Sequence, residues 1–274
     1  MNIWTSFEIP TFEDQLNLPQ KEAIQQLRIE DSELGLSADE FCLDHPKLKE
    51  MIREYNNKVG TLMMTYTLVY HYFNKGIPDD KWYQSPGTNG QSVQYMPDFK
   101  EEHWGRSIWF GYFANVFYLT ISSIWDSVLE IINHYYDYDF PSDLRLRSTV
   151  LKKIKNDHPD VHAIFVEVQS SPIYEIAQEY RTAAAHGTTP NSVTNTICVE
   201  RGEAMPFPQY DENGNPILDN EGKQVVQQRK YRKIEFRIGS YTRTNDIFKN
   251  MQDYAVFSAD KIHEILSKMN TVPF

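Results

Sequence analysis

The stretch EEHWGRSIWFGYFANVFYLTISSIWDSVLEIINHYY, residues 101–136, is the most hydrophobic part of the chain and decides the fold. Its apolar side chains recur every three to four residues and on more than one side, which is typical of a helix buried within a bundle. This pattern is carried by Trp109, Phe113, Val116, Ile121, Ile124, Trp125, Val128 and Ile132. We therefore expect a long central helix with other helices packed around it.

Helical spacing also appears on both sides of this stretch. Residues 48–73 carry it, with Asp44 as the expected N-cap, Pro46 just inside the helix and Gly76 as the stop. Further helices are expected over residues 141–154, 159–170, 172–186 and 245–269. The segment between Gly76 and Phe99 is rich in Gly, Pro, Asn and Ser, which predicts a long surface loop.

The periodicity changes from 3.6 to 2 after residue 190. Residues 192–200 are rich in β-branched side chains, and residues 233–238 alternate between apolar and charged ones. The turn residues between them predict an antiparallel hairpin. The expected fold is therefore mainly α: a helical bundle over residues 44–274, with one hairpin inserted at about 192–240. Residues 1–43, acidic and interrupted by prolines, are expected to form an N-terminal extension.

Composition excludes some classes of protein but does not identify the function. The chain has 274 residues, 14% aromatic residues and a net charge of −11, which excludes a protein that mainly coats nucleic acid. Cys42 and Cys198 are too few for a disulfide framework or a four-cysteine zinc site. No apolar run reaches the roughly 18 residues of a membrane span, and the acidic N-terminus does not match a secretory signal. We expect a cytoplasmic protein with no membrane association and no cofactor.

The sharpest candidate for chemistry is YRTAAAHG, residues 180–187. It places Arg181 and His186 five residues apart at the end of a helix, with Gly187 as the stop. At about 100° per residue, the two side chains point roughly 140° apart on a regular helix. Arginine matches phosphate oxygens with a permanent charge, and histidine can transfer a proton near neutral pH. Together they could cleave RNA without a metal, and a two-fold dimer would bring two such pairs together.

The motif and its setting resemble the HEPN superfamily. Its hallmark is an arginine, four to six residues and a histidine at the end of a helix in a helical bundle, which Arg181 and His186 match. The resemblance covers about residues 101–269 and implies a metal-independent endoribonuclease, often a toxin or defence effector, that acts as a homodimer. The residue after the arginine is often Asn, Asp or His in this family, whereas here it is Thr182, whose hydroxyl can form a hydrogen bond but cannot carry a charge.

This hypothesis assigns roles to several further residues. Arg181 would hold the phosphate and His186 would transfer protons, with Thr182 and Tyr180 assisting. Ala184 and Ala185 would allow close approach at the dimer contact. The basic cluster of the hairpin supplies Arg229 and Arg232 as candidate RNA contacts.

Two other functions stay open. The chain could be a non-catalytic module in which the hairpin or the loop 76–99 binds nucleic acid or a partner protein, or a bundle that holds a small ligand. In a purely structural interpretation, Arg181 forms a surface ion pair and His186 is favoured by the helix dipole.

Other candidates have plausible structural explanations as well. Asp126 and Glu130 could orient Arg181 or His186, or simply face solvent. His158 and His162 have metal-ligand spacing but no carboxylate complement, so we expect no metal site. His71 is expected to pack. An aromatic group could stack bases but fits the core better: Trp104, Trp109, Phe110, Tyr112 and Phe113.

Overall fold

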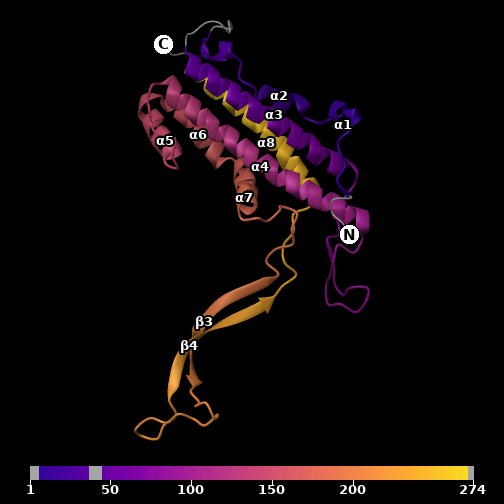
Figure 1. Cartoon of the computed structure of the whole chain (residues 1–274), viewed down its shortest axis with the longest axis vertical. Helices are drawn as coiled ribbons and strands as arrows, with labels where there is room; N and C mark the ends of the chain where they lie inside the picture. The colour runs from indigo at the N-terminus through magenta and orange to yellow at the C-terminus, as the bar shows by residue number, and fades with distance from the viewer. Residues whose placement is uncertain (1–5, 37–44, 271–274) are drawn as a thin grey trace. The chain divides into compact units, whose positions relative to one another are not determined.

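The long apolar stretch forms one continuous helix, α4 (Glu101–Tyr135), in a computed structural model that describes residues 6–36 and 45–270. It packs against α3 (Pro46–Asn74) and α8 (Thr244–Met269), and Figure 1 shows these three long helices side by side. None of the helices in the described ranges is both long enough and apolar enough to cross a bilayer. The expected mainly α fold is confirmed, and the described residues contain two small antiparallel strand pairs where one hairpin was expected.

Paired residues give the direction of each long helix. Lys58 Nζ donates to Ser127 Oγ at 2.6 Å, and the rings of Phe73 and Phe110 lie 6.3 Å apart. Between these two contacts the residue number rises along α3 and falls along α4, so the two helices are antiparallel. In contrast, Tyr118 bonds to Asn250 and Trp125 bonds to Ser258, which makes α4 and α8 parallel.

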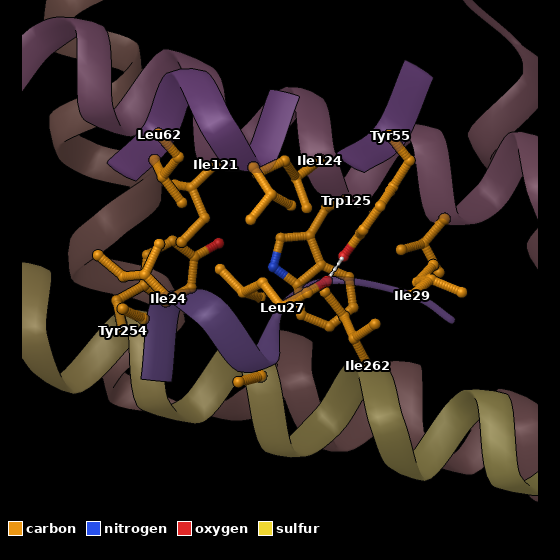
Figure 2. Packing of buried hydrophobic residues seen from close by; sticks show 14 of the residues in the cluster. Ile24, Leu27, Ile29, Tyr55, Leu62, Ile121, Ile124, Trp125, Tyr254 and Ile262 are labelled. Atoms are coloured by element: carbon orange, nitrogen blue, oxygen red, sulfur yellow. Dashed lines mark hydrogen bonds between the residues drawn. The ribbon is translucent and has the colours of Figure 1, made fainter. Parts of the chain in front are cut away.

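The N-terminal residues contribute to the core of the bundle. Helices α1 (Phe12–Leu16) and α2 (Lys21–Gln26) and the short 3₁₀ helix η2 (Asp31–Leu34) lie along the bundle. Figure 2 shows Ile24, Leu27 and Ile29 inserted among side chains of the long helices, and all three are buried. The buried Tyr55 hydroxyl donates to the Leu27 carbonyl at 2.8 Å. The domain boundary at residue 43 stays a prediction, but residues 18–36 pack as part of the bundle.

Three shorter helices complete the bundle: α5 (Leu146–Asp157), α6 (Pro159–Ser170) and α7 (Pro172–Ala185). Both α6 and α7 begin with proline, whose missing N–H costs nothing in a first helical turn. The expectation for α5 was wrong at its start, because Pro141 to Arg145 form turns and the helix begins at Leu146. Asp44 and Cys42 lie outside the described residues, and α3 has His45 at its N-cap in the left-handed region.

The chain divides into two compact units, and the second, residues 193–241, is the hairpin. Strand β3 (Ile197–Pro208) pairs antiparallel with β4 (Val226–Phe236), with a bulge between Arg201 and Ala204. At its far end, Asp211 and Asp219 each accept backbone N–H groups two and four residues ahead, which fixes two tight turns. The loop 76–99 contains the small pair β1 (Tyr83–Gln84) and β2 (Gln94–Tyr95).

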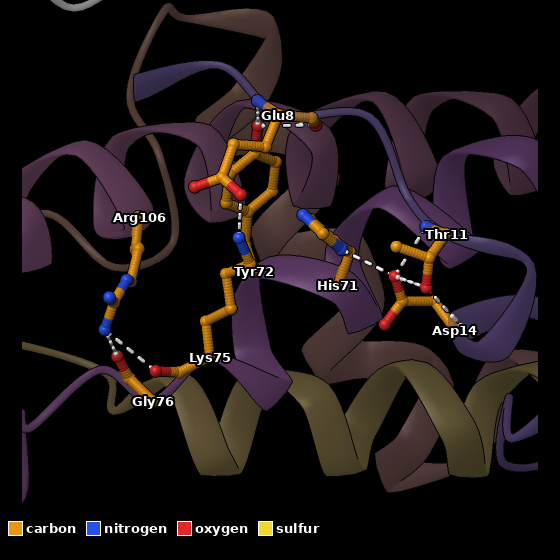
Figure 3. A network of polar contacts seen from close by, with 8 residues as sticks. All are labelled: Glu8, Thr11, Asp14, His71, Tyr72, Lys75, Gly76 and Arg106. Carbon is orange, nitrogen blue, oxygen red and sulfur yellow. Dashed lines mark hydrogen bonds and ion pairs between the residues drawn. The ribbon is translucent and has the colours of Figure 1, made fainter. Parts of the chain in front are cut away.

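Polar contacts attach the N-terminal segment to the end of α3 (Figure 3). His71, only 4% exposed, lies with Nδ1 2.8 Å from Asp14 Oδ2, and the Thr11 amide donates to the same oxygen at 2.7 Å. Burial alone would raise the pKa of the Asp14 carboxyl. The hydrogen bonds from Thr11 and His71 outweigh this effect, so the pKa lies below its ordinary value of 3.8. Because an ionised carboxylate only accepts, His71 donates from Nδ1. The expected packing role of His71 thus includes a specific partner.

The far end of this network fixes the chain where α3 ends. Arg106 on α4 donates to the carbonyls of Lys75 and Gly76, at 2.8 and 3.3 Å (Figure 3). Lys75 in turn pairs with Glu8, whose backbone N–H donates to the Tyr72 hydroxyl. The carbonyls that follow α3 and have no partner within the helix therefore accept hydrogen bonds from a side chain of α4.

We expect Asp14→Ala to lower the free energy of unfolding by about 1–3 kcal/mol, because the buried imidazole loses its acceptor. Urea denaturation measures this change. The charge-dependent part is complete above about pH 3.8 and is lost as the pH falls through the lowered pKa of Asp14. The exposed neighbour Glu13→Ala is the control and should change the free energy by under about 0.5 kcal/mol. Equal effects of the two substitutions would contradict the assignment.

Candidate functional site

The end of α7 is built as the sequence predicts. His186 is the C-cap, and Gly187 follows in the left-handed region at φ 77°. The N–H groups of His186 and Thr188 donate to the carbonyls of Thr182 and Ala183, at 3.2 and 3.0 Å. Because glycine enters this conformation without a steric penalty, Gly187 ends the helix directly after the histidine.

Helix α4 holds the segment that follows this end. Asn115 donates to the Thr188 carbonyl at 3.3 Å, and Asn191 donates to the carbonyl and hydroxyl of Ser107, at 2.9 and 3.0 Å. Gly111 permits this approach, since a Cβ there would lie 2.2 Å from Asn191 Oδ1. The orientation of the motif therefore depends on contacts with α4 as well as on α7 itself.

Arg181 and His186 are both exposed and lie on different flanks of α7. Arg181 lines a cleft of about 490 Å³ formed by α4, α5, α6 and α7, which we call the arginine cleft. Its lining residues are Ser122, Trp125, Asp126, Arg147, Gln169, Tyr174, Gln178 and Arg181. His186 lines a wider groove of about 850 Å³, the histidine groove. This is lined by Gln169, Ser170, Tyr174, Glu175, Gln178, Glu179, Thr182, Ala183, His186 and Thr188. The two depressions share Gln169, Tyr174 and Gln178, but Arg181 lines only the first and His186 only the second.

Neither side chain has a competing partner among the residues that the structure describes. Within the part of the chain that the structure describes, Arg181 forms no ion pair and no side-chain hydrogen bond, and the same holds for His186. The structural interpretation of Arg181 as a surface ion pair is thus not supported. Both groups are available to a ligand.

The arginine cleft contains a second arginine that sequence reasoning missed. Arg147 on α5 donates from Nη2 to the Tyr174 hydroxyl at 2.7 Å, and its Nη1 lies 4.0 Å from Asp126 Oδ1. Arg147 lies more than 30 positions before the motif, and nothing in its local sequence distinguishes it from neighbouring surface residues. Packing of α5 and α7 beside α4 brings it to the cleft.

Asp126 and Glu130, the two acidic candidates on α4, line different depressions of the surface. Asp126 lines the arginine cleft, whereas Glu130 accepts a hydrogen bond from Ser142 at 2.8 Å and lines a different depression with Lys47 and His134. Only Asp126 is therefore placed to influence Arg181.

Two neighbours of the arginine differ in their surroundings. Thr182 is exposed and lines the histidine groove beside His186. The half-buried Tyr180 packs its ring 5.1 Å from that of Tyr118, and burial raises the pKa of its hydroxyl. Tyr180 lines neither the arginine cleft nor the histidine groove, so its contact with a substrate stays a prediction.

The basic residues of the hairpin face both sides of the ribbon. Arg229 pairs with Met205 and Arg232 with Arg201 in the strand register. Since successive side chains alternate, these two arginines point to opposite faces: Arg232 shares its face with Lys230, and Arg229 shares its face with Lys233. All four are exposed.

The remaining candidates are mostly structural. Trp109 and Phe110 are buried, whereas Trp104 and Tyr112 keep 43% and 53% of their surface exposed. His158 lies at the α5–α6 junction, where its ring stacks on Tyr136 at 3.7 Å. Cys198 is a free thiol. No cluster of metal-binding side chains occurs among residues 6–36 and 45–270.

Comparison with known proteins identifies the family. A family model described as Cthe2314-like HEPN matches residues 51–270, which run from α3 to the end of α8. The chain belongs to this HEPN family. The resemblance drawn from Arg181 and His186 is therefore confirmed, and the matched region includes α3, which the resemblance had left out. No curated protein and no solved structure gives a match.

We expect Gly111→Ala to destabilise this HEPN bundle by about 1–3 kcal/mol, because the new methyl group overlaps Asn191 and must displace the segment after α7. Thermal unfolding followed by circular dichroism measures the effect. Gly60→Ala is the matched control. A Cβ at this position in α3 meets nothing within 4 Å, so the change should stabilise the protein by up to about 1 kcal/mol. If Gly111→Ala were equally harmless, close packing at Asn191 would not position the motif.

Proposed function

We propose that this chain is a metal-independent endoribonuclease, of the kind found in toxin or defence systems, whose site is shared by two copies. The observation that carries the proposal is the pair Arg181 and His186 at the exposed end of α7, in a chain of the HEPN family. Neither side chain has a polar partner among residues 6–36 and 45–270. Arg181 and His186 line two adjoining depressions of one chain, and a second copy would add a further such pair around a single phosphate.

The chemistry uses proton transfer and charge stabilisation. One His186 takes the proton of a ribose 2′-hydroxyl, whose oxygen attacks the adjacent phosphorus. The bond from phosphorus to the 5′ oxygen breaks, and the His186 of the second copy protonates that leaving oxygen. Arg181 stabilises the negative charge that develops on the phosphoryl oxygens. Thr182, beside His186 in the groove, can donate a hydrogen bond to the same group.

Binding of the rest of the RNA is assigned to the basic strand of the hairpin. Arg229 and Arg232 on β4 are exposed, and their opposite directions allow contacts with backbone phosphates on both faces of the ribbon. The acidic balance of the whole chain limits such contacts to local cationic sites.

The test of catalysis is His186→Ala together with Arg181→Ala. We expect each to lower the rate of cleavage of a single-stranded RNA by at least about 100-fold with the fold intact. Gel electrophoresis of end-labelled RNA measures the rate, and circular dichroism checks the fold. Unchanged cleavage by His186→Ala would remove that residue from the mechanism.

The shared site has its own test. A heterodimer of one wild-type chain and one chain with both substitutions is purified through two different affinity tags. We expect its activity to fall far below half that of the wild-type dimer, because the single site has lost one of its two pairs. Retention of half the activity would show that each chain carries a complete site.

The alternative is a non-catalytic module that binds nucleic acid or a partner protein. Thr182 favours it, because the family often has Asn, Asp or His at this position, and so does the net charge of −11. RNA bound in a gel-shift assay but left uncleaved by the same sample would select this function.

A further inference from the structure

We propose that the arginine cleft is a second phosphate site, in which Arg147 binds a backbone phosphate of the RNA next to the one that is cleaved. The inference rests on the proposed function and adds a binding residue outside the Arg181–His186 motif. It starts from the position of Arg181, which belongs to the motif and also lines the same cleft as Arg147.

The first support is charge. Among the described residues that line the cleft, Arg147, Arg181 and Asp126 are ionisable besides the Tyr174 phenol. This lining carries a net positive charge in a chain whose net charge is −11. Four other polar lining side chains can donate hydrogen bonds: Ser122, Gln169, Tyr174 and Gln178. A cleft with these donors favours an anion.

The second support is the preorganisation of Arg147. Its guanidinium is held at Nη2 by the hydroxyl of Tyr174, which is only 9% exposed and packs its ring 6.2 Å from that of the buried Tyr254. One hydrogen bond leaves the other N–H groups of the guanidinium free, and their planar arrangement matches two oxygens of a phosphate. Because Tyr174 fixes one end, little side-chain entropy is lost on binding.

Asp126 does not occupy the place of the anion. Its carboxylate lies 4.0 Å from Arg147 Nη1 and keeps 60% of its surface exposed, so the pair is weak and screened by water. A phosphate that accepts two hydrogen bonds from the guanidinium competes well against it. The cleft volume of about 490 Å³ lies within the range of about 300–1,000 Å³ that is usual for ligand sites.

The geometry also explains why the ligand is a neighbouring phosphate of the same strand. Arg181 lies on α7 and Arg147 on α5, and both line the single cleft. A strand whose scissile phosphate lies at Arg181 would therefore have Arg147 within the same cleft for an adjacent phosphate. This arrangement makes Arg147 a residue that binds substrate without touching the reacting atoms.

The experiment measures binding and cleavage separately in the full-length protein. Binding is measured by fluorescence anisotropy with a short single-stranded RNA in which 2′-O-methyl groups block cleavage. For Arg147→Gln we expect an affinity lower by about tenfold and a salt dependence whose slope falls by about 0.7, the value for one lost phosphate contact on a single strand. In cleavage of the unmodified RNA, KM should rise by a similar factor while kcat changes little.

Arg145→Gln is the matched control, because it removes the same charge from an exposed arginine that precedes the same helix and does not line the cleft. It should leave affinity and slope near wild type. Arg147→Lys keeps the charge and should preserve the slope while losing part of the affinity, which separates phosphate binding from a folding defect. Tyr174→Phe should weaken binding less than Arg147→Gln does.

The outcomes separate this inference from the proposed function. If Arg147→Gln binds like Arg145→Gln while His186→Ala still abolishes cleavage, the second phosphate site is wrong and the nuclease stands. If the wild-type protein binds RNA through Arg147 without cleaving it, the site is supported and the nuclease fails. If wild-type protein neither binds nor cleaves, both are wrong.

Discussion

The burial of α4 against two long helices is the constraint on which the rest of the structure depends. Its apolar residues leave water on more than one side, so α3 and α8 must pack along it, one antiparallel and one parallel. Tyr118 and Trp125 find hydrogen-bond partners on α8, which satisfies the polar atoms that this burial removes from water. Once α4 is fixed, it becomes the reference for every residue of the candidate site.

The site is formed by short elements that take their position from this helix. Only Tyr174 and Ala177 of α7 are buried, so the packing of this helix gives limited control over the position of its end. Two hydrogen bonds between α4 and the segment after α7 also hold this end: Asn115 donates to Thr188, and Asn191 donates to Ser107. The absence of a side chain at Gly111 allows Asn191 to approach α4. The end of α7 is exposed while the segment after it is held by α4, which suits a site that binds a second molecule.

Local charge matters more here than the total. An acidic chain repels nucleic acid at long range, but two arginines in one cleft create a short-range site where the field is focused. The hairpin also separates its charges, with a basic strand β4 and acidic residues in its turns. Association with RNA would then depend strongly on position along the surface and on salt.

The sequence by itself determined the helices, the hairpin and the motif, because hydrophobic periodicity and Gly or Pro at helix ends are local properties. It also placed Arg181 and His186 on different sides of α7, since helix geometry fixes the angle between them. Tertiary structure alone brought Arg147 and Asp126 to Arg181, turned Tyr180 toward Tyr118 and packed residues 18–36 into the core. These contacts join residues far apart in the chain, and their positions follow from how whole helices pack, which no local pattern records.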